Sequence, residues 1–244
     1  MRVAVISDIH GNIAALEAVL NDIARRGVDR IVNLGDCLSG PFDAAATADR
    51  LIALDALTVR GNHDRMLYGP GQQGLWEDWA LEDLGTDHLE WVKSMPPSAR
   101  LGDVFLCHAT PDSDVEDWLD FRGPQNRLVA RDLAEVELRA AGISQRVMLC
   151  GHTHTPRVVR LPDGRMIVNP GAVGCPAYRD DRTDPPFTHQ TGAPDARYAI
   201  LEKQGDAWQA DLLAVPYDAT EMARLARARG AESWAEAVTT GWLA

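Results

Sequence analysis

Residues 1–10 read MRVAVISDIH, and this stretch decides the fold. Residues 2–6 form a short apolar run rich in β-branched side chains, which is typical of a buried strand. Two polar residues, Asp8 and His10, follow at once. Because residues i and i+2 of an extended segment point the same way, both side chains can face one site. Alone the pair is a weak signal, since a polar loop with Asp8 as a helix cap is its more common origin.

The segments that follow alternate between helix and strand. Residues 13–25 place apolar side chains on one helical face, with Asn12 expected as the cap. Residues 30–34 form another apolar run, 42–54 have a helical pattern and 57–60 are strand-like. This order predicts βαβ units around a mostly parallel sheet.

The second half of the chain predicts further strands and helices. Apolar runs at 103–107 and 146–150 indicate strands, and 157–169 and 197–215 indicate two hairpins. Without an internal repeat or a break in composition, residues 1–244 are expected to form a single domain. The remaining expected segments are helices at 75–84, 86–94, 126–141 and 218–244, and an irregular loop at 171–194.

Polar motifs follow four further predicted strands. In chain order they are Gly35-Asp36, Gly61-Asn62-His63-Asp64, His108, and Gly151-His152-Thr153-His154. The carboxyl ends of parallel strands meet at one edge of a sheet, which is where such folds place their sites. A turn would explain any one motif, but together with His10 these motifs contain five of the seven histidines of the chain. The pattern therefore predicts one site rich in Asp, Asn and His.

In this order the motifs resemble the pattern of the calcineurin-like metallophosphoesterases. Residues 169–174 (NPGAVG) are also similar to a segment of their small single-domain bacterial and archaeal branch. The resemblance extends over residues 1–203. It implies an α/β fold, a four-layer αββα sandwich with two mixed β-sheets flanked by helices. The hairpins at 157–169 and 197–215 would both contribute to the second sheet.

The resemblance also implies two divalent metal ions (Mn, Fe or Zn), which suit a mixed set of oxygen and nitrogen ligands. A metal-bridging hydroxide would be the nucleophile. His63, which is not needed as a ligand, would stabilise the developing charge or act as a general acid, and Asp64 would orient it. A simple turn cap is the alternative role for Asp64. The implied ligands are Asp8, His10, Asp36 and His154 for one ion, and Asp36, Asn62, His108 and His152 for the other.

The resemblance therefore implies hydrolysis of phosphate esters, with a small phosphorylated molecule as the substrate. A phosphodiesterase is expected, because small members of that branch tend to act on phosphodiesters. A protein phosphatase or a dinucleoside polyphosphate hydrolase is the alternative among enzymes. A non-enzymatic scaffold of the same fold is the alternative outside them, and the presence of His63 disfavours it.

Two groups of side chains allow more than one interpretation. The first consists of arginines that could meet a substrate phosphate, although solvated surface charge is their more common role: Arg65, Arg179 and Arg182. The second consists of tryptophans, for which core packing is favoured over a platform that stacks bases: Trp76, Trp79, Trp91 and Trp118.

The composition limits the partners and the compartment. The chain has 24 Lys and Arg against 36 Asp and Glu, a formal net charge of −12. Non-specific binding to nucleic acid or to an anionic membrane is not expected, because both need a basic surface. Four cysteines without a CxxC pair, no signal peptide and no run of 18 apolar residues predict a cytoplasmic protein with reduced thiols.

Overall fold

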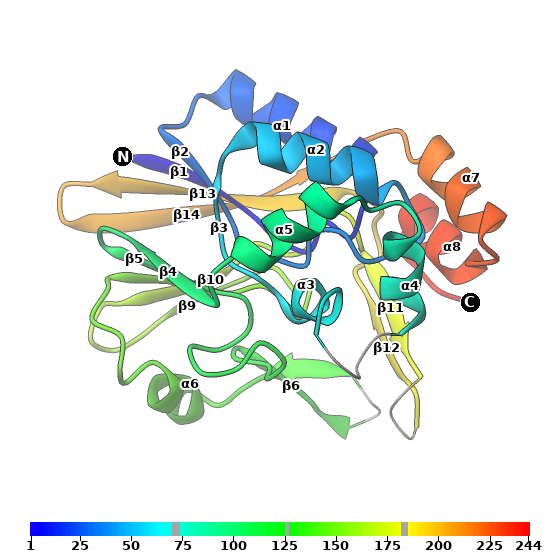
Figure 1. Cartoon of the computed structure of the whole chain (residues 1–244). Helices are drawn as coiled ribbons and strands as arrows, with labels where there is room; N and C mark the ends of the chain where they lie inside the picture. The colour runs from blue at the N-terminus through cyan, green and yellow to red at the C-terminus, as the bar shows by residue number, and fades with distance from the viewer. Residues whose placement is uncertain (70–73, 125–126, 182–184) are drawn as a thin grey trace.

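The computed structural model describes residues 1–69, 74–124, 127–181 and 185–244 (Figure 1). Two five-stranded mixed sheets pack against each other, and helices cover their outer faces. Valine and leucine side chains from both sheets fill the space between them, including Val5, Leu106 and Val168. The expected α/β fold with four αββα layers is confirmed.

The first sheet contains the strand that opens the chain. β1 (Arg2–Ile6) runs parallel to β2 (Arg30–Asn33), and β2 runs parallel to β3 (Leu57–Thr58). On its other side β1 pairs antiparallel with β13, with Ala4 opposite Ile200. In spatial order the strands are β14 (Ala207–Val215), β13 (Ala196–Gln204), β1 (Arg2–Ile6), β2 (Arg30–Asn33) and β3 (Leu57–Thr58).

The predicted hairpin at 197–215 is therefore in the first sheet, and its expected place in the second sheet was wrong. Tyr198 and Ile200 pack in the core on the helix side of the sheet, whereas Ala199 and Leu201 face the other sheet. A strand with both faces buried fits beside β1 in the interior of a sheet. Its apolar pattern is equally compatible with either sheet, so only tertiary packing decides between them.

The second sheet contains the other predicted hairpin, at 157–169, as expected. β5, β8 and β10 run parallel, and β4 and β9 pair antiparallel at the two edges. In spatial order the strands are β4 (Ser98–Leu101), β5 (Val104–Cys107), β8 (Val147–Leu149), β10 (Met166–Asn169) and β9 (Arg157–Arg160).

Helices lie on the outer faces of both sheets and around the site. Asn12 caps α1, because its Oδ1 accepts a hydrogen bond from the backbone N–H of Ala15 at 3.0 Å. No described helix has the length and apolar character needed to cross a membrane. The helices are α1 (Ile13–Arg26), α2 (Ala44–Leu54), α3 (Asn62–Met66), α4 (Leu75–Leu81), α5 (Thr86–Ser94), α6 (Leu133–Arg139), α7 (Thr220–Ala228) and α8 (Glu232–Thr240).

Two short hairpins replace structure that the sequence indicated differently. β6 (Asp120–Arg122) pairs with β7 (Leu128–Ala130), so the helix expected at 126–141 begins only at Leu133. β11 (Ala177–Asp180) pairs with β12 (Phe187–Gln190) inside the expected loop at 171–194. Strands of three or four residues are too short to show a period of two. Contacts between the hairpins hold them, such as the guanidinium of Arg122 over the ring of Phe187 at 4.4 Å.

Candidate active site

The strand-end motifs meet on backbone of unusual conformation. Among the described residues, six that are not glycine have a positive φ, and five of them are predicted ligands. The left-handed region costs a residue with a side chain roughly 1–3 kcal/mol and persists where the surroundings enforce it, often at functional sites. These five are Asp8 (φ 55°), His10 (52°), Asp36 (54°), His152 (67°) and His154 (55°).

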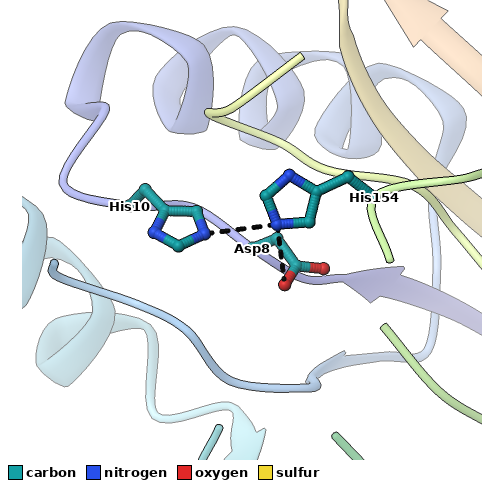
Figure 2. Close-up of side chains that lie close together, drawn as sticks. All are labelled: Asp8, His10 and His154. Atoms are coloured by element: carbon teal, nitrogen blue, oxygen red, sulfur yellow. Dashed lines mark hydrogen bonds and ion pairs between the residues drawn. The ribbon is translucent and has the colours of Figure 1, made fainter. Parts of the chain in front are cut away.

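Asp8, His10 and His154 form the first ligand cluster, shown in Figure 2. All three are buried, and their potential ligand atoms lie within 4.8 Å of one another. His154 Nε2 is 3.4 Å from Asp8 Oδ1 and 3.3 Å from His10 Nε2. His10 Nδ1 lies 3.0 Å from the carbonyl oxygen of Ser39, and His154 Nδ1 lies 2.8 Å from that of Cys175.

These backbone contacts make the first cluster suitable for a cation. A carbonyl can only accept, so each Nδ1 carries a proton and donates it, which leaves each neutral ring with a lone pair on Nε2. Two Nε2 atoms therefore face each other beside the Asp8 carboxylate. Burial, reinforced by the positive charge of His154, lowers the pKa of His10 to about 3, so the His10 ring is neutral at pH 7. Burial opposes a charge on His154, but the Asp8 carboxylate outweighs it and raises the pKa of His154 above its usual value, so a cation would displace the proton on His154 Nε2.

Asp36, His108 and His152 form the second cluster. His108 Nδ1 donates to the carbonyl of Leu34 at 2.8 Å, and its Nε2 is 3.1 Å from Asp36 Oδ2. The same Nε2 is 3.1 Å from Oδ1 of Asn62, which brings the predicted amide ligand to this cluster. Burial opposes a charge on His108, but Asp36 outweighs it and raises the pKa of this ring to about 9.

The donor chemistry of both clusters fits the implied metal ions. Each has two imidazoles and a carboxylate, a mixed set that Mn, Fe and Zn accept. Backbone carbonyls orient the rings, as is usual behind metal-binding histidines. The contacts place Asp36 in the second cluster. The resemblance alone implies that Asp36 also binds the ion of the first cluster.

His63 lies at the edge of these clusters and has a partner that the sequence did not indicate. Its Nδ1 contacts the carboxylate of Glu77, which is 2% exposed, and its ring stacks on Trp76 with centroids 5.0 Å apart. Both partners come from α4. Burial opposes a charge on His63, but the carboxylates of Asp36 and Glu77 together raise its pKa above the usual value.

Asp64 does not make the expected orienting contact with His63. Its carboxylate accepts hydrogen bonds from the backbone N–H groups of Asp36 (2.7 Å), Cys37 (2.9 Å) and Gly61 (2.8 Å). Asp64 thus joins the loops after β2 and β3, which is closer to the alternative role as a turn cap. The physical reason is that α3 starts at Asn62, so the Asp64 side chain turns back to the Gly61 N–H at its start, where the loop after β2 also lies.

The arginines and tryptophans for which the sequence allowed two interpretations occupy different kinds of position. Arg65 pairs with Asp114 at 2.6 Å and Arg179 with Asp181 at 2.6 Å, whereas Arg182 lies outside the described residues. Core packing holds for Trp79 and Trp118, which are buried, and for Trp91, which packs against the core beside α1 and α2. Trp76 is only half-buried and lies beside His63.

Comparison with known proteins agrees with this geometry. Residues 1–191 match the model of the calcineurin-like phosphoesterase superfamily domain. The chain is 27% identical over 241 residues to the uncharacterized protein MJ0912 of Methanocaldococcus jannaschii, covering 88% of each. It also resembles the crystal structure of a metallophosphoesterase from Sphaerobacter thermophilus, with 26% identity, a TM-score of 0.76, and coverage of 99% of this chain and 100% of that one. The chain therefore belongs to the calcineurin-like phosphoesterase superfamily.

Proposed function

We propose that the chain is a two-metal phosphodiesterase in which His63 assists departure of the leaving oxygen. The observation that carries this proposal is the placement of His63 beside two buried His-carboxylate clusters, at one cavity. The cavity is lined by His63 and by ligands from both clusters, so a bound ester would be within reach of all of them.

The first ion would be held by the Asp8 cluster and the second by Asp36, Asn62, His108 and His152, with Asp36 shared. Bound divalent ions supply an activated water and neutralise charge on the phosphoryl oxygens. The chain itself must then provide a proton for the departing alkoxide.

His63 is suited to provide that proton. Its Nδ1 faces a buried carboxylate, and a negative charge at that position favours the imidazolium form. The contact with Glu77 also fixes the ring, so Nε2, on the opposite side of the imidazole, keeps one direction. General acid help of this kind contributes roughly 10²–10⁴-fold to a rate. Glu77 is thus a positioning residue, because it acts through His63.

The charge around the site favours a diester over a monoester. Asp117, which belongs to neither ligand cluster, lines the cavity with Oδ1 3.7 Å from His152 Nε2, so its carboxylate would repel additional negative charge on a bound ester. A monoester has a second ionisation near pKa ~6 and approaches two negative charges at neutral pH, whereas a diester has one. The same repulsion disfavours phosphoproteins and dinucleoside polyphosphates.

The test compares bis(p-nitrophenyl) phosphate with p-nitrophenyl phosphate on Mn²⁺-loaded protein. We expect a higher kcat/KM for the diester. On a methyl diester, whose departing alkoxide needs a proton, we expect His63→Gln to lose roughly 10²-fold or more in kcat with unchanged metal content. His88→Gln is the matched control, because His88 lies on α5 and contacts Asp49. Absence of turnover on both esters would favour the non-enzymatic scaffold, and loss of metal from His63→Gln would make His63 a ligand.

A further inference from the structure

The cavity at the metal centre is large enough for an organic group as well as the phosphate. Its volume is about 350 Å³, and one side is formed by His63, His152 and His154. Small-molecule sites usually enclose about 300–1,000 Å³. An ester whose phosphorus lies at the ligands would therefore place its substituent in the remainder of this cavity.

The wall that receives the substituent is aromatic. The ring of Tyr178 is 4.9 Å from that of the ligand His154, 5.9 Å from Phe187 and 6.3 Å from Trp76. Tyr178 and Trp76 are both half-buried, and both line the cavity. The side chains of this wall come from α4, β11 and β12. These three elements lie on the same side of the molecule in Figure 1.

Leucines complete the wall at two further points of the cavity. Leu75 precedes Trp76 on α4, and Leu128 belongs to β7. Planar rings gain about 1–3 kcal/mol by stacking on aromatic side chains, and this gain needs no specific hydrogen bond. A flat, uncharged ring is the ligand that such a wall accommodates best.

The charges in this outer part of the cavity do not favour a second anion. Its described lining contains two arginines, and each is already paired with a carboxylate. Arg122 lies 3.1 Å from Asp180, and Arg179 lies 2.6 Å from Asp181. Asp117 adds a further carboxylate to the lining. Both pairs are at least partly exposed, so an additional phosphate would compete with Asp180 and Asp181 for these two guanidinium groups of the described lining.

We propose that this cavity binds an uncharged planar ring carried by the organic group of the ester, as a nucleoside base or an aryl group does. The proposal rests on the phosphoesterase function and names its substrate class. This substrate class consists of compact esters that carry one ring. It excludes polyphosphates, because their extra charge meets the carboxylates, and phosphoproteins, because their bulk exceeds the cavity.

Matched substrates test the ring without changing the scissile bond. The first pair is the methyl diester of adenosine 5′-phosphate and that of methyl riboside 5-phosphate, which differ only by the base. The second pair is benzyl methyl phosphate and cyclohexylmethyl methyl phosphate, which differ by aromaticity. With Mn²⁺-loaded protein, we expect the planar member of at least one pair to have a kcat/KM at least about 5-fold higher. The pair that responds identifies the source of the ring.

Binding of adenosine to the Mn²⁺-loaded protein gives a readout that needs no turnover, because adenosine carries no phosphate ester. Adenosine should bind at least about 5-fold more tightly than methyl riboside in a calorimetric titration. Equal binding together with equal kcat/KM in both pairs would overturn the ring pocket while leaving phosphoesterase activity intact. Failure of the proposed function looks different, because bis(p-nitrophenyl) phosphate would not be hydrolysed at all.

Variants of Tyr178 connect the preference to the wall. In whichever pair responds, Tyr178→Leu should reduce the ratio of kcat/KM between the planar and the non-planar member to below about half of the wild-type ratio, and Tyr178→Phe should preserve it. Phe121→Leu is the matched control, because Phe121 lies on the neighbouring β6 and is 38% exposed outside the cavity lining. An unchanged ratio in Tyr178→Leu, or an equal drop in Phe121→Leu, would contradict this assignment.

Discussion

Nδ1 of His63 contacts the buried carboxylate of Glu77, 14 positions further along the chain. The second carboxylate oxygen of Glu77 accepts a hydrogen bond from the backbone N–H of Gly74 at 2.8 Å. The carboxylate is therefore fixed at the start of α4, and through it the imidazole is fixed as well. Trp76, which stacks on a face of the His63 ring, belongs to the same turn of α4 as Glu77. The position of α4 thus determines the position of the proposed general acid.

Glu77→Gln should slow hydrolysis most for esters with poor leaving groups. The amide keeps the size of the side chain and the bond to Gly74, but it removes the charge that favours imidazolium at His63. We expect kcat for a methyl diester to fall roughly 10- to 100-fold, with a smaller fall for a p-nitrophenyl diester, whose leaving group needs no proton. KM and metal content should change little. The measurement is kcat and KM on both esters.

The matched control is Glu82→Gln, because Glu82 is an exposed residue at the end of the same helix. An equal loss on both esters would indicate that Glu77 has a structural role only. If Glu82→Gln lost as much activity as Glu77→Gln, the effect would come from α4 as a whole and not from the contact with His63.

Loss of one ligand should weaken metal binding at one cluster and leave the other cluster intact. His154→Ala removes an imidazole from the Asp8 cluster and leaves His108 and His152 in place. A ligand at 100 times its Kd stabilises the folded state by about 2.7 kcal/mol, so metal removal should lower Tm. We expect part of the Mn²⁺-dependent rise in Tm to be lost in His154→Ala, with one bound ion remaining by elemental analysis. Two ions retained at full affinity would contradict the assignment.

That the candidate ligands lie close together could be predicted from the sequence, because their positions follow from strand order. Asp8 comes directly after an apolar strand, and His108 and His152 follow others, so recognising strands was enough to bring these residues together. Glu77 could not be found in this way. Its spacing from Gly74 is that of an ordinary helix cap, and only the packing of α4 brings it to His63.

The aromatic wall could not be predicted from the sequence either, for a different reason. Tyr178 and Phe187 lie in strands of four residues within a segment rich in Pro, Gly and Asp. Strands this short are defined by their partners and not by their own periodicity. The hairpin at 197–215 illustrates the same limit, since its strands were correctly expected but its sheet depended on which edge of β1 was open.

A hydrogen bond between α1 and β13 should make stability depend on pH. Asp22 Oδ2 accepts from the Tyr198 hydroxyl at 2.7 Å and from Arg26 at 2.6 Å. Partial burial opposes the charge, but these bonds outweigh it and lower the pKa of Asp22 to about 2. A lowered carboxyl pKa contributes stability above the unfolded value of 3.8, and this contribution is lost as pH falls towards 2.

Asp22→Asn should therefore reduce the free energy of unfolding by about 1–2 kcal/mol at pH 7. The difference from the wild type should shrink as pH falls from 4 to 2, as far as the folded state survives. Urea unfolding at several pH values measures this. Asp29→Asn is a control with its carboxylate exposed beside the N-terminus, and a deficit in Asp22→Asn that does not change with pH would contradict the ionic origin.

The close approach of two loops at Gly174 should make this glycine essential for the first cluster. A Cβ at Gly174 would lie 1.8 Å from the carbonyl oxygen of Ile9, which is backbone between Asp8 and His10. Gly174 N–H also donates to the carbonyl of Asp8 at 3.0 Å, so the two loops cannot separate without losing that bond. Gly174→Ala must therefore displace the loop that carries both ligands, at a cost of about 2 kcal/mol or more.

Gly142→Ala is the matched control, because a Cβ there meets nothing within 4 Å. We expect Gly174→Ala to lower both Tm and Mn²⁺ affinity while Gly142→Ala changes neither by much, and wild-type Mn²⁺ affinity in Gly174→Ala would show that the Asp8 loop tolerates the displacement.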